Sequence, residues 1–98
     1  MHVIVDFTVV PVGTGLSLSP YVAEVERVLR RSGLHHQLHA NGTNVEGDWD
    51  AVMGAIRDCH LALHAMGVVR IHTDVKLGTR TDRDQSMADK VASVEARL

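Results

Sequence analysis

Two apolar periodicities follow one another along the chain, and their order is the strongest constraint on its fold. Apolar and polar side chains alternate, as in strands, over residues 2–10, 34–40, 43–46 and 68–77. Apolar side chains recur every three or four residues, as in helices, over residues 20–32, 49–66 and 87–98. Pro11 ends the first strand, Gly33 and Gly67 end two helices, and Asn41-Gly42 predicts a tight hairpin turn.

The predicted order is therefore strand, helix, strand, strand, helix, strand, helix, which matches a ferredoxin-like pattern through its first six elements. We predict an α+β fold: a βαββαβ sandwich with a four-stranded antiparallel sheet and an extra C-terminal helix. The first and third strands should be central, and the helices should cover one face of the sheet and leave the other face polar. A chain of 98 residues is long enough for one core, so we expect a single domain over residues 1–98.

Composition argues against several classes of partner. Ten basic residues against 12 acidic ones give a net charge of -2, which disfavours nonspecific binding to nucleic acid or anionic membranes. The only aromatic residues, Phe7, Tyr21 and Trp49, are too few for a base-stacking surface. No apolar run approaches the roughly 20 residues of a membrane span. We therefore expect a soluble, cytoplasmic protein that has no nucleic-acid or membrane partner.

The chemistry of known ferredoxin-like proteins narrows the function further. An acylphosphatase needs an arginine in its first loop, and residues 11–20 contain neither arginine nor lysine. A metallochaperone needs paired cysteines in that loop, whereas Cys59 is the only cysteine of the chain and lies elsewhere. The sequence therefore argues against both of these activities, and we expect no cofactor.

Histidine is abundant, with seven copies, and raises the question of a metal site. His60 and His64 are four residues apart on a predicted helix and could share one ion, but two ligands do not make a site. We favour a hydrogen-bonded core histidine at position 60. His35, His36 and His39 alternate between two faces of a strand, so we predict no dedicated metal site.

Polar side chains that suit a ligand gather at one end of the predicted sheet. The loop before the first helix offers Ser17 and Ser19, and the hairpin offers Asn41 and Thr43. The amino terminus of the first helix also presents free backbone N–H groups that favour an anion such as phosphate. The alternative is that Ser19 only caps the helix and Ser17 only faces water.

Glu46 is a separate candidate because it alternates with Val45 and so points to the open face of a central strand. A carboxylate covered there needs a positive or hydrogen-bonding partner, which a ligand could provide. The alternative is an internal salt bridge with Arg70 or Lys76.

Three stretches, taken together, resemble the thiamine-binding protein family, long catalogued as an uncharacterised family. They are PVGTGLSLSPYV at residues 11–22, GTNVEG at residues 42–47 and MGVVRIHTDVKL at residues 66–77. The resemblance continues through Arg80, Asp82, Met87, Lys90 and Val91. Their order across most of the chain makes the combination specific, although histidines replace the tyrosine-rich second strand associated with the family.

The resemblance implies a non-enzymatic protein that binds thiamine or a thiamine-like pyrimidine compound and forms a homo-oligomer, expected to be a tetramer. In that interpretation Ser17, Ser19, Asn41 and Thr43 hydrogen-bond to the ligand, and Glu46 recognises its charge. Two alternatives stay open: a structural or regulatory oligomer without that ligand, and a minor metal-binding role for the histidines.

Overall fold

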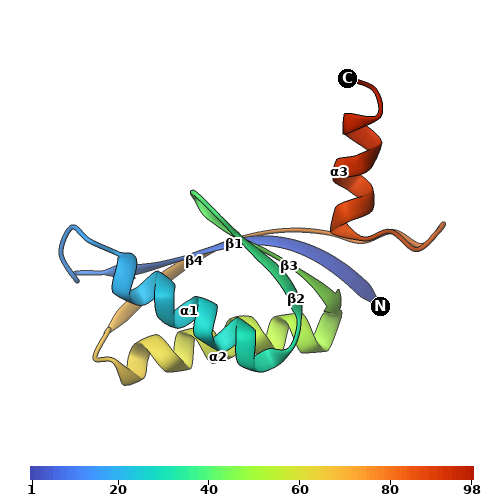
Figure 1. The fold of residues 1–98 in the computed structure, drawn as a ribbon. Coiled ribbons are helices and arrows are strands. Elements are labelled where there is room, and N and C mark those ends of the chain that lie inside the picture. The colour runs from blue at the N-terminus through green and yellow to red at the C-terminus, as the bar shows by residue number, and fades with distance from the viewer.

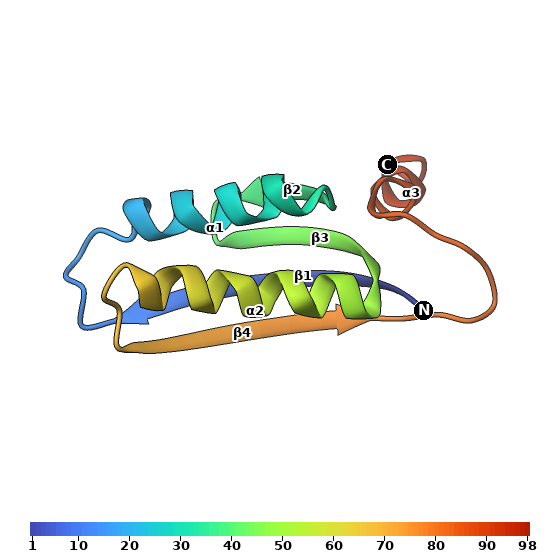
Figure 2. The ribbon, with the colours of Figure 1, turned by 90° about the horizontal axis from the view of Figure 1, so that it is seen from below.

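The computed structural model describes all residues, 1–98, and has the predicted ferredoxin-like α+β architecture. Its elements are β1 (His2–Val12), α1 (Ser19–Ser32), β2 (His35–His39), β3 (Gly42–Asp48), α2 (Trp49–Ala65), β4 (Arg70–Gly78) and α3 (Met87–Glu95). The antiparallel sheet has the order β2-β3-β1-β4, so β1 and β3 are central as predicted. Figures 1 and 2 show α1 and α2 against one face of the sheet and α3 on the other side.

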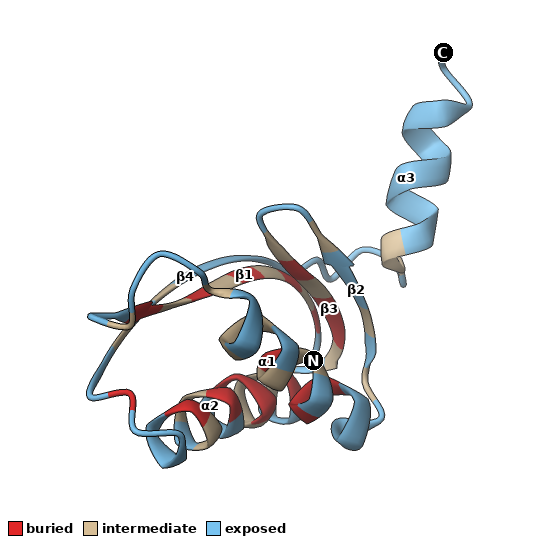
Figure 3. Cartoon of the chain, turned by 60° about the vertical axis from the view of Figure 1, so that its left-hand side comes forward, coloured by how far each residue is buried: buried red, intermediate tan, exposed pale blue.

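A single apolar core lies between the sheet and the two helices that cover it (Figure 3). On β1 the inward positions are every second residue, Val3, Val5, Phe7 and Val9, in agreement with the predicted alternation. The helices contribute one stripe each, formed by Val25, Val28 and Leu29 and by Val52, Ala55, Ile56, Cys59 and Leu63. Phe7 therefore belongs to the core and not to an exposed stacking surface.

The first strand runs two residues beyond its predicted end at residue 10, passes through Pro11 and ends at Val12. Pairing between β1 and β3 ends at Phe7, whereas pairing with β4 continues to Val12. Proline is tolerated in a strand where one side has no partner, because its missing N–H then costs no ladder bond. The prediction that Pro11 ends the strand was therefore wrong.

Two glycines of the GTNVEG stretch are required by close packing. A Cβ at Gly42 would lie 2.7 Å from the Thr8 hydroxyl and 2.8 Å from the Phe7 carbonyl oxygen. A Cβ at Gly47 would lie 2.9 Å from the Leu34 side chain, and its φ of +154° also disfavours other residues. This stretch is therefore constrained by β1 and by the chain entering β2, independently of any ligand.

The start of α1 differs from the expected one. Ser19 is the first helical residue, and the cap position falls on Leu18, which makes no side-chain hydrogen bond. The proposed capping role of Ser19 was therefore wrong. The end of the helix agrees with the prediction, because Gly33 adopts the left-handed conformation at φ +73°.

The last helix has a capped N-terminus, but its apolar side chains are exposed. Ser86 and Asp89 form a capping box, in which the Ser86 hydroxyl accepts from the Asp89 N–H and the Asp89 carboxylate accepts from the Ser86 N–H. The apolar stripe is nevertheless exposed, with Val91 at 57%, Val94 at 61% and Leu98 at 99% of their accessible surface. No residue of α3 is buried, so the apolar stripe of this helix packs against nothing within the single chain. None of the helices combines the length and apolar character required to cross a bilayer.

Candidate functional site

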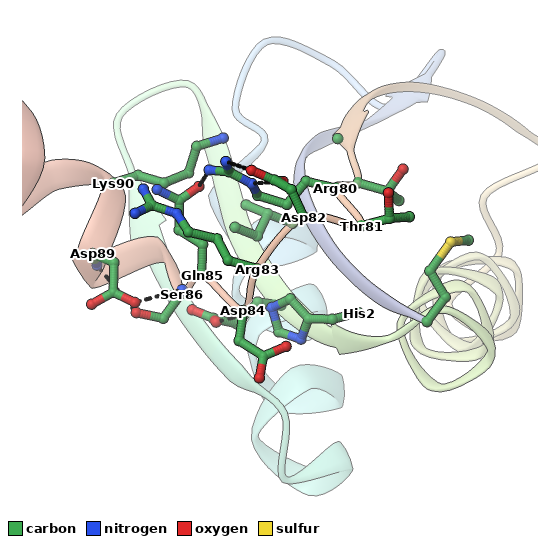
Figure 4. A pocket seen from close by; sticks show the side chains of 15 residues that line it. His2, Arg80, Thr81, Asp82, Arg83, Asp84, Gln85, Ser86, Asp89 and Lys90 are labelled. Carbon is green, nitrogen blue, oxygen red and sulfur yellow. Dashed lines mark hydrogen bonds and ion pairs between the residues drawn. The ribbon is translucent and has the colours of Figure 1, made fainter.

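A polar cleft of about 1240 Å³ opens where the ends of β3 and β4 meet the beginning of β1 (Figure 4). Residues 78–86 and the first turn of α3 form much of its wall, and only two of its 15 lining residues are hydrophobic. The other contributors are Met1, His2, Ile4 and Glu46. A cleft of this composition suits a ligand that carries charges and hydrogen-bonding groups.

Glu46 is the buried charged group of this cleft, with 7% of its surface exposed. Its Oε2 atom accepts a hydrogen bond of 3.0 Å from the Met87 backbone N–H and lies 3.0 Å from His35 Nδ1. Its Oε1 atom lies 3.3 Å from His2 Nε2. These nitrogen partners offset the free-energy cost of removing a carboxylate from water. The side chains of His2 and His35 themselves remain about half exposed or more.

Strand register explains why neither cation proposed as a partner of Glu46 contacts it. Glu46 lies opposite Ile4, and Ile4 in turn lies opposite Gly78 at the end of β4. Lys76 is opposite Asp6, and Arg70 is at the other end of β4, opposite Val12. The predicted salt bridges of Glu46 with Arg70 or Lys76 were therefore wrong, and histidines from β1 and β2 take that place.

The hydrogen bond between Met87 and Glu46 also links the cleft to α3. The donor is a backbone N–H of the first turn, which has no partner within the helix. Because α3 buries none of its residues, this contact and the preceding loop are what position Ser86 and Lys90 at the cleft.

The loop before α3 holds a compact ionic group. Arg80 donates from Nε to Asp82 Oδ1 at 2.7 Å and from Nη1 to Gln85 Oε1 at 3.0 Å. The hydrogen bond from Arg80 lowers the pKa of the Asp82 carboxyl to about 2, and the same bond raises the pKa of Arg80. The Arg80 side chain is therefore oriented and remains charged at any physiological pH.

The structure does not bring the predicted ligand residues together. Ser17 and Ser19 are exposed near the loop that follows β1, at the end of the sheet remote from the cleft (Figure 1). Asn41 lies in the hairpin, where its carbonyl oxygen accepts a 2.7 Å hydrogen bond from the Thr8 hydroxyl. Thr43 is buried on the helix-covered side and donates to Glu26 of α1 at 2.9 Å.

Glu46 therefore stands apart from the other four predicted residues. Alternation along β3 puts Thr43 and Glu46 on opposite faces, and only Glu46 lines the cleft. The loop after β1 and the hairpin do lie toward the same end of the sheet, as expected. However, β1 pairs with β3 only as far as Phe7 and continues to Val12, so the loop begins beyond the hairpin.

The remaining histidines have structural partners. His60 Nε2 lies 2.6 Å from the Thr73 hydroxyl, between α2 and β4, so the predicted hydrogen bond is present, but His60 is half-buried and not part of the core. Burial lowers its pKa, with a smaller contribution from His64. His39 Nε2 lies 2.7 Å from Asp6 Oδ1 on the open face. No group of three or more potential ligands is arranged to hold a metal ion.

The sequence reasoning missed most of the cleft. Arg80, Arg83 and Gln85 lie in the loop before α3 and Lys90 lies in its first turn, and none of them was predicted as a site residue. A signal existed for His35, because the short hairpin sets its register directly opposite Glu46. No periodicity could place the loop beside the sheet, since loops carry no such pattern.

Comparison with known proteins identifies the family. The family model described as "Thiamine-binding protein" matches residues 5–95, nearly the entire chain. The chain belongs to the thiamine-binding protein family. The resemblance inferred from the three sequence stretches is thereby confirmed.

Curated members of the family include proteins from distant organisms. UPF0045 protein sll0230 of Synechocystis is 54% identical over 98 residues, which cover all of this chain and 81% of the relative. UPF0045 protein ECM15 of Eremothecium gossypii is 46% identical over 99 residues, covering all of this chain and 94% of the relative. These names specify no catalytic activity.

Solved structures with the same fold include proteins from an archaeon and a bacterium. Protein MJ1052 of Methanocaldococcus jannaschii superposes with a TM-score of 0.87 at 27% identity, over 96% of each chain. A Thermotoga maritima protein, TM0486, provisionally assigned to thiamine biosynthesis or salvage, gives a TM-score of 0.82 at 17% identity, over 96% of this chain and 99% of that chain. The latter likeness shows the fold alone.

Proposed function

We propose that this protein is a cytoplasmic, non-enzymatic binder of thiamine or a thiamine-like pyrimidine compound, and that the ligand occupies the cleft at Glu46. The observation that carries the proposal is a buried carboxylate facing a polar cleft in a member of the thiamine-binding family. The provisional role given to the Thermotoga protein, thiamine biosynthesis or salvage, is consistent with such a ligand.

The chemistry of Glu46 matches the two polar features of thiamine. The aminopyrimidine ring offers an N–H donor, and the thiazolium ring carries a positive charge. An ionised carboxylate has about four acceptor sites, and Glu46 has three nitrogen partners. One site remains for the ligand, and the half-exposed His2 can be displaced to provide another.

Calorimetric titration with thiamine, and separately with its hydroxymethylpyrimidine fragment, tests the proposal. We expect saturable heat with thiamine and a rise in the melting temperature on binding. Absence of both heat and thermal shift at millimolar thiamine would overturn the proposal and favour a structural or regulatory oligomer.

The role of Glu46 is tested by Glu46→Gln, which keeps the size of the side chain and removes its charge. We expect affinity for thiamine to fall by about 1–3 kcal/mol, the usual value of a hydrogen bond to a charged group. Glu95→Gln on the exposed side of α3 is the matched control and should bind as the parent does. Unchanged affinity in a folded Glu46→Gln variant removes Glu46 from the site.

We also propose a homotetramer, because two separate surfaces lack a partner. The α3 stripe is exposed, and the edge strand β4 exposes Val75 and Leu77 beside unpaired backbone groups. Two different interfaces, each repeated by a two-fold axis, assemble four copies. A second copy of the chain would bury the stripe that gives α3 its amphipathic pattern.

Molar mass from light scattering tests this assembly. Val91→Asp/Val94→Asp places two charges on the α3 stripe, and we expect it to reduce the tetramer to a smaller species. The control, Ala92→Asp/Ala96→Asp, places the same charges on other sides of the helix and should leave the mass unchanged. A monomeric parent, or equal masses for both variants, contradicts the proposal.

The roles of Ser17, Ser19, Asn41 and Thr43 remain predictions for the opposite end of the sheet. Ser17→Ala/Ser19→Ala removes both exposed hydroxyls without touching the cleft. Weaker thiamine binding in this variant would assign the ligand to the β1–α1 loop, and unchanged binding would dismiss these serines.

A further inference from the structure

The cleft has a cationic side that the Glu46 site does not use. Arg80, Arg83 and Lys90 all line it, although the chain as a whole has a net charge of -2. In Figure 4 their charged ends lie on the same side of the loop, around Gln85, whereas the Asp84 carboxylate points the other way, toward His2. Positive charge is thus concentrated at one wall of an otherwise slightly acidic protein.

The acidic residues of the same segment do not neutralise all three cations. Asp82 pairs with Arg80 alone, and Asp89 is engaged by the backbone and hydroxyl of Ser86. Neither Arg83 nor Lys90 forms an ion pair, although the charge of Arg83 contributes to lowering the pKa of the Asp82 and Asp89 carboxyls. Two cations without an ion-pair partner therefore stand beside a guanidinium that is already held in one orientation.

We propose that this cationic wall is a phosphate subsite, and that the ligand class of the cleft is a phosphate ester of a thiamine-like compound. The proposal rests on the proposed function and extends it. A planar guanidinium and a lysine ammonium are the groups that bind phosphate oxygens most directly, through charge-assisted hydrogen bonds.

The two sides of the cleft then fit the two ends of one ligand. Glu46 lies at the β3 side, and the cationic wall lies on residues 80–90. A thiamine phosphate likewise has its aminopyrimidine donor at one end and its anionic phosphate at the other, with the positive thiazolium ring between them. The volume of about 1240 Å³ accommodates the phosphate in addition to both rings.

Parallel titrations of thiamine, thiamine monophosphate and inorganic pyrophosphate at low ionic strength test the subsite. We expect thiamine monophosphate to bind at least about tenfold more tightly than thiamine, because its phosphate adds charge-assisted hydrogen bonds to the guanidinium and ammonium groups. The preference should shrink as salt is added, since exposed charges are screened. Equal affinities overturn the phosphate subsite and leave the proposed function intact.

Arg83→Gln/Lys90→Gln removes the two cations without an ion-pair partner and is compared with Arg30→Gln/Arg57→Gln, an equal charge change on exposed helix positions. Only the first pair should abolish the preference for the phosphate ester over thiamine. If both double variants lose the preference for the phosphate ester equally, the effect is one of overall charge, and the assignment of the phosphate subsite is overturned.

Pyrophosphate separates the two proposals. Thiamine could produce no heat while pyrophosphate binds to the parent but not to Arg83→Gln/Lys90→Gln. In that case the thiamine proposal fails and the anion subsite stands. If neither thiamine, its monophosphate nor pyrophosphate binds, both proposals fail.

Discussion

At the scale of single residues, Gly42 shows how a recurring sequence stretch can serve packing. We predict that Gly42→Ala lowers the free energy of unfolding by about 1–3 kcal/mol, because a methyl group would press against the carbonyl of a central strand. Gly54→Ala is the control: it lies within α2 with no atom near its Cβ, and should stabilise by up to about 1 kcal/mol. Urea unfolding measures both, and equal effects would contradict the packing argument.

Cys59 gives a second residue-level prediction. Burial, together with smaller contributions from Glu26 and Asp58, raises the pKa of its thiol to about 12. The thiolate is the reactive form, so the folded protein should not react with a disulfide reagent at about pH 8. The same protein in concentrated guanidinium should react at once, and rapid reaction of the folded form would refute the buried, neutral thiol.

Alternation along a strand was sufficient to orient Glu46, but not to find its partners. Outward placement follows from Val45 being buried, whereas His2 and Met87 reach Glu46 from distant parts of the chain. Their approach depends on strand order and on the path of a loop. Such contacts are set by the tertiary structure and leave no local pattern.

At the scale of elements, α3 depends on its capping box and on one hydrogen bond to Glu46, because none of its side chains is buried. Ser86→Ala removes the hydroxyl that accepts from Asp89, which should cost the helix about 1 kcal/mol. We expect faster hydrogen exchange in α3 and little change in the core, because α3 buries no residue. Ser93→Ala is the control, and loss of protection in α1 as well would contradict this independence.

The contact between α2 and β4 predicts a pH dependence through His60. Burial lowers the pKa of this histidine below its ordinary value of 6.5, so the unfolded chain takes up the proton first. The stability that neutral His60 provides is therefore present above pH 6.5 and is lost as the pH falls toward the lowered pKa. The free energy of unfolding should fall less between about pH 7.5 and 5.5 in His60→Gln than in the parent. His72→Gln, at an exposed position, should behave as the parent, and an unchanged slope in His60→Gln would exclude this residue as the cause.

The elements themselves were largely predictable because each carries a strong repeat. Strand ends were less predictable. β1 passes through Pro11 because its pairing with β3 ends at Phe7, and β3 continues past the predicted residue 46 to Asp48. The apolar periodicity over residues 87–98 correctly predicted a helix. Periodicity identifies the apolar face of a helix, but it does not show what packs against that face.

At the scale of the whole molecule, the shape is extended for its length. The radius of gyration is 14.5 Å, against about 13 Å for a compact chain of this size, because α3 stands away from the core. If a second copy covers α3, the melting temperature should rise with protein concentration. Scanning calorimetry over a hundredfold concentration range measures this, and a constant melting temperature would indicate that α3 is uncovered in solution.

The location of the cleft has a consequence for how the family can diversify. Most of its wall belongs to one continuous stretch that follows the last core strand, and that stretch buries no residue. Substitutions, insertions or transplanted segments there leave the packing of the core untouched. Ligand preference can therefore drift, or be engineered, on a scaffold whose folding stability stays constant.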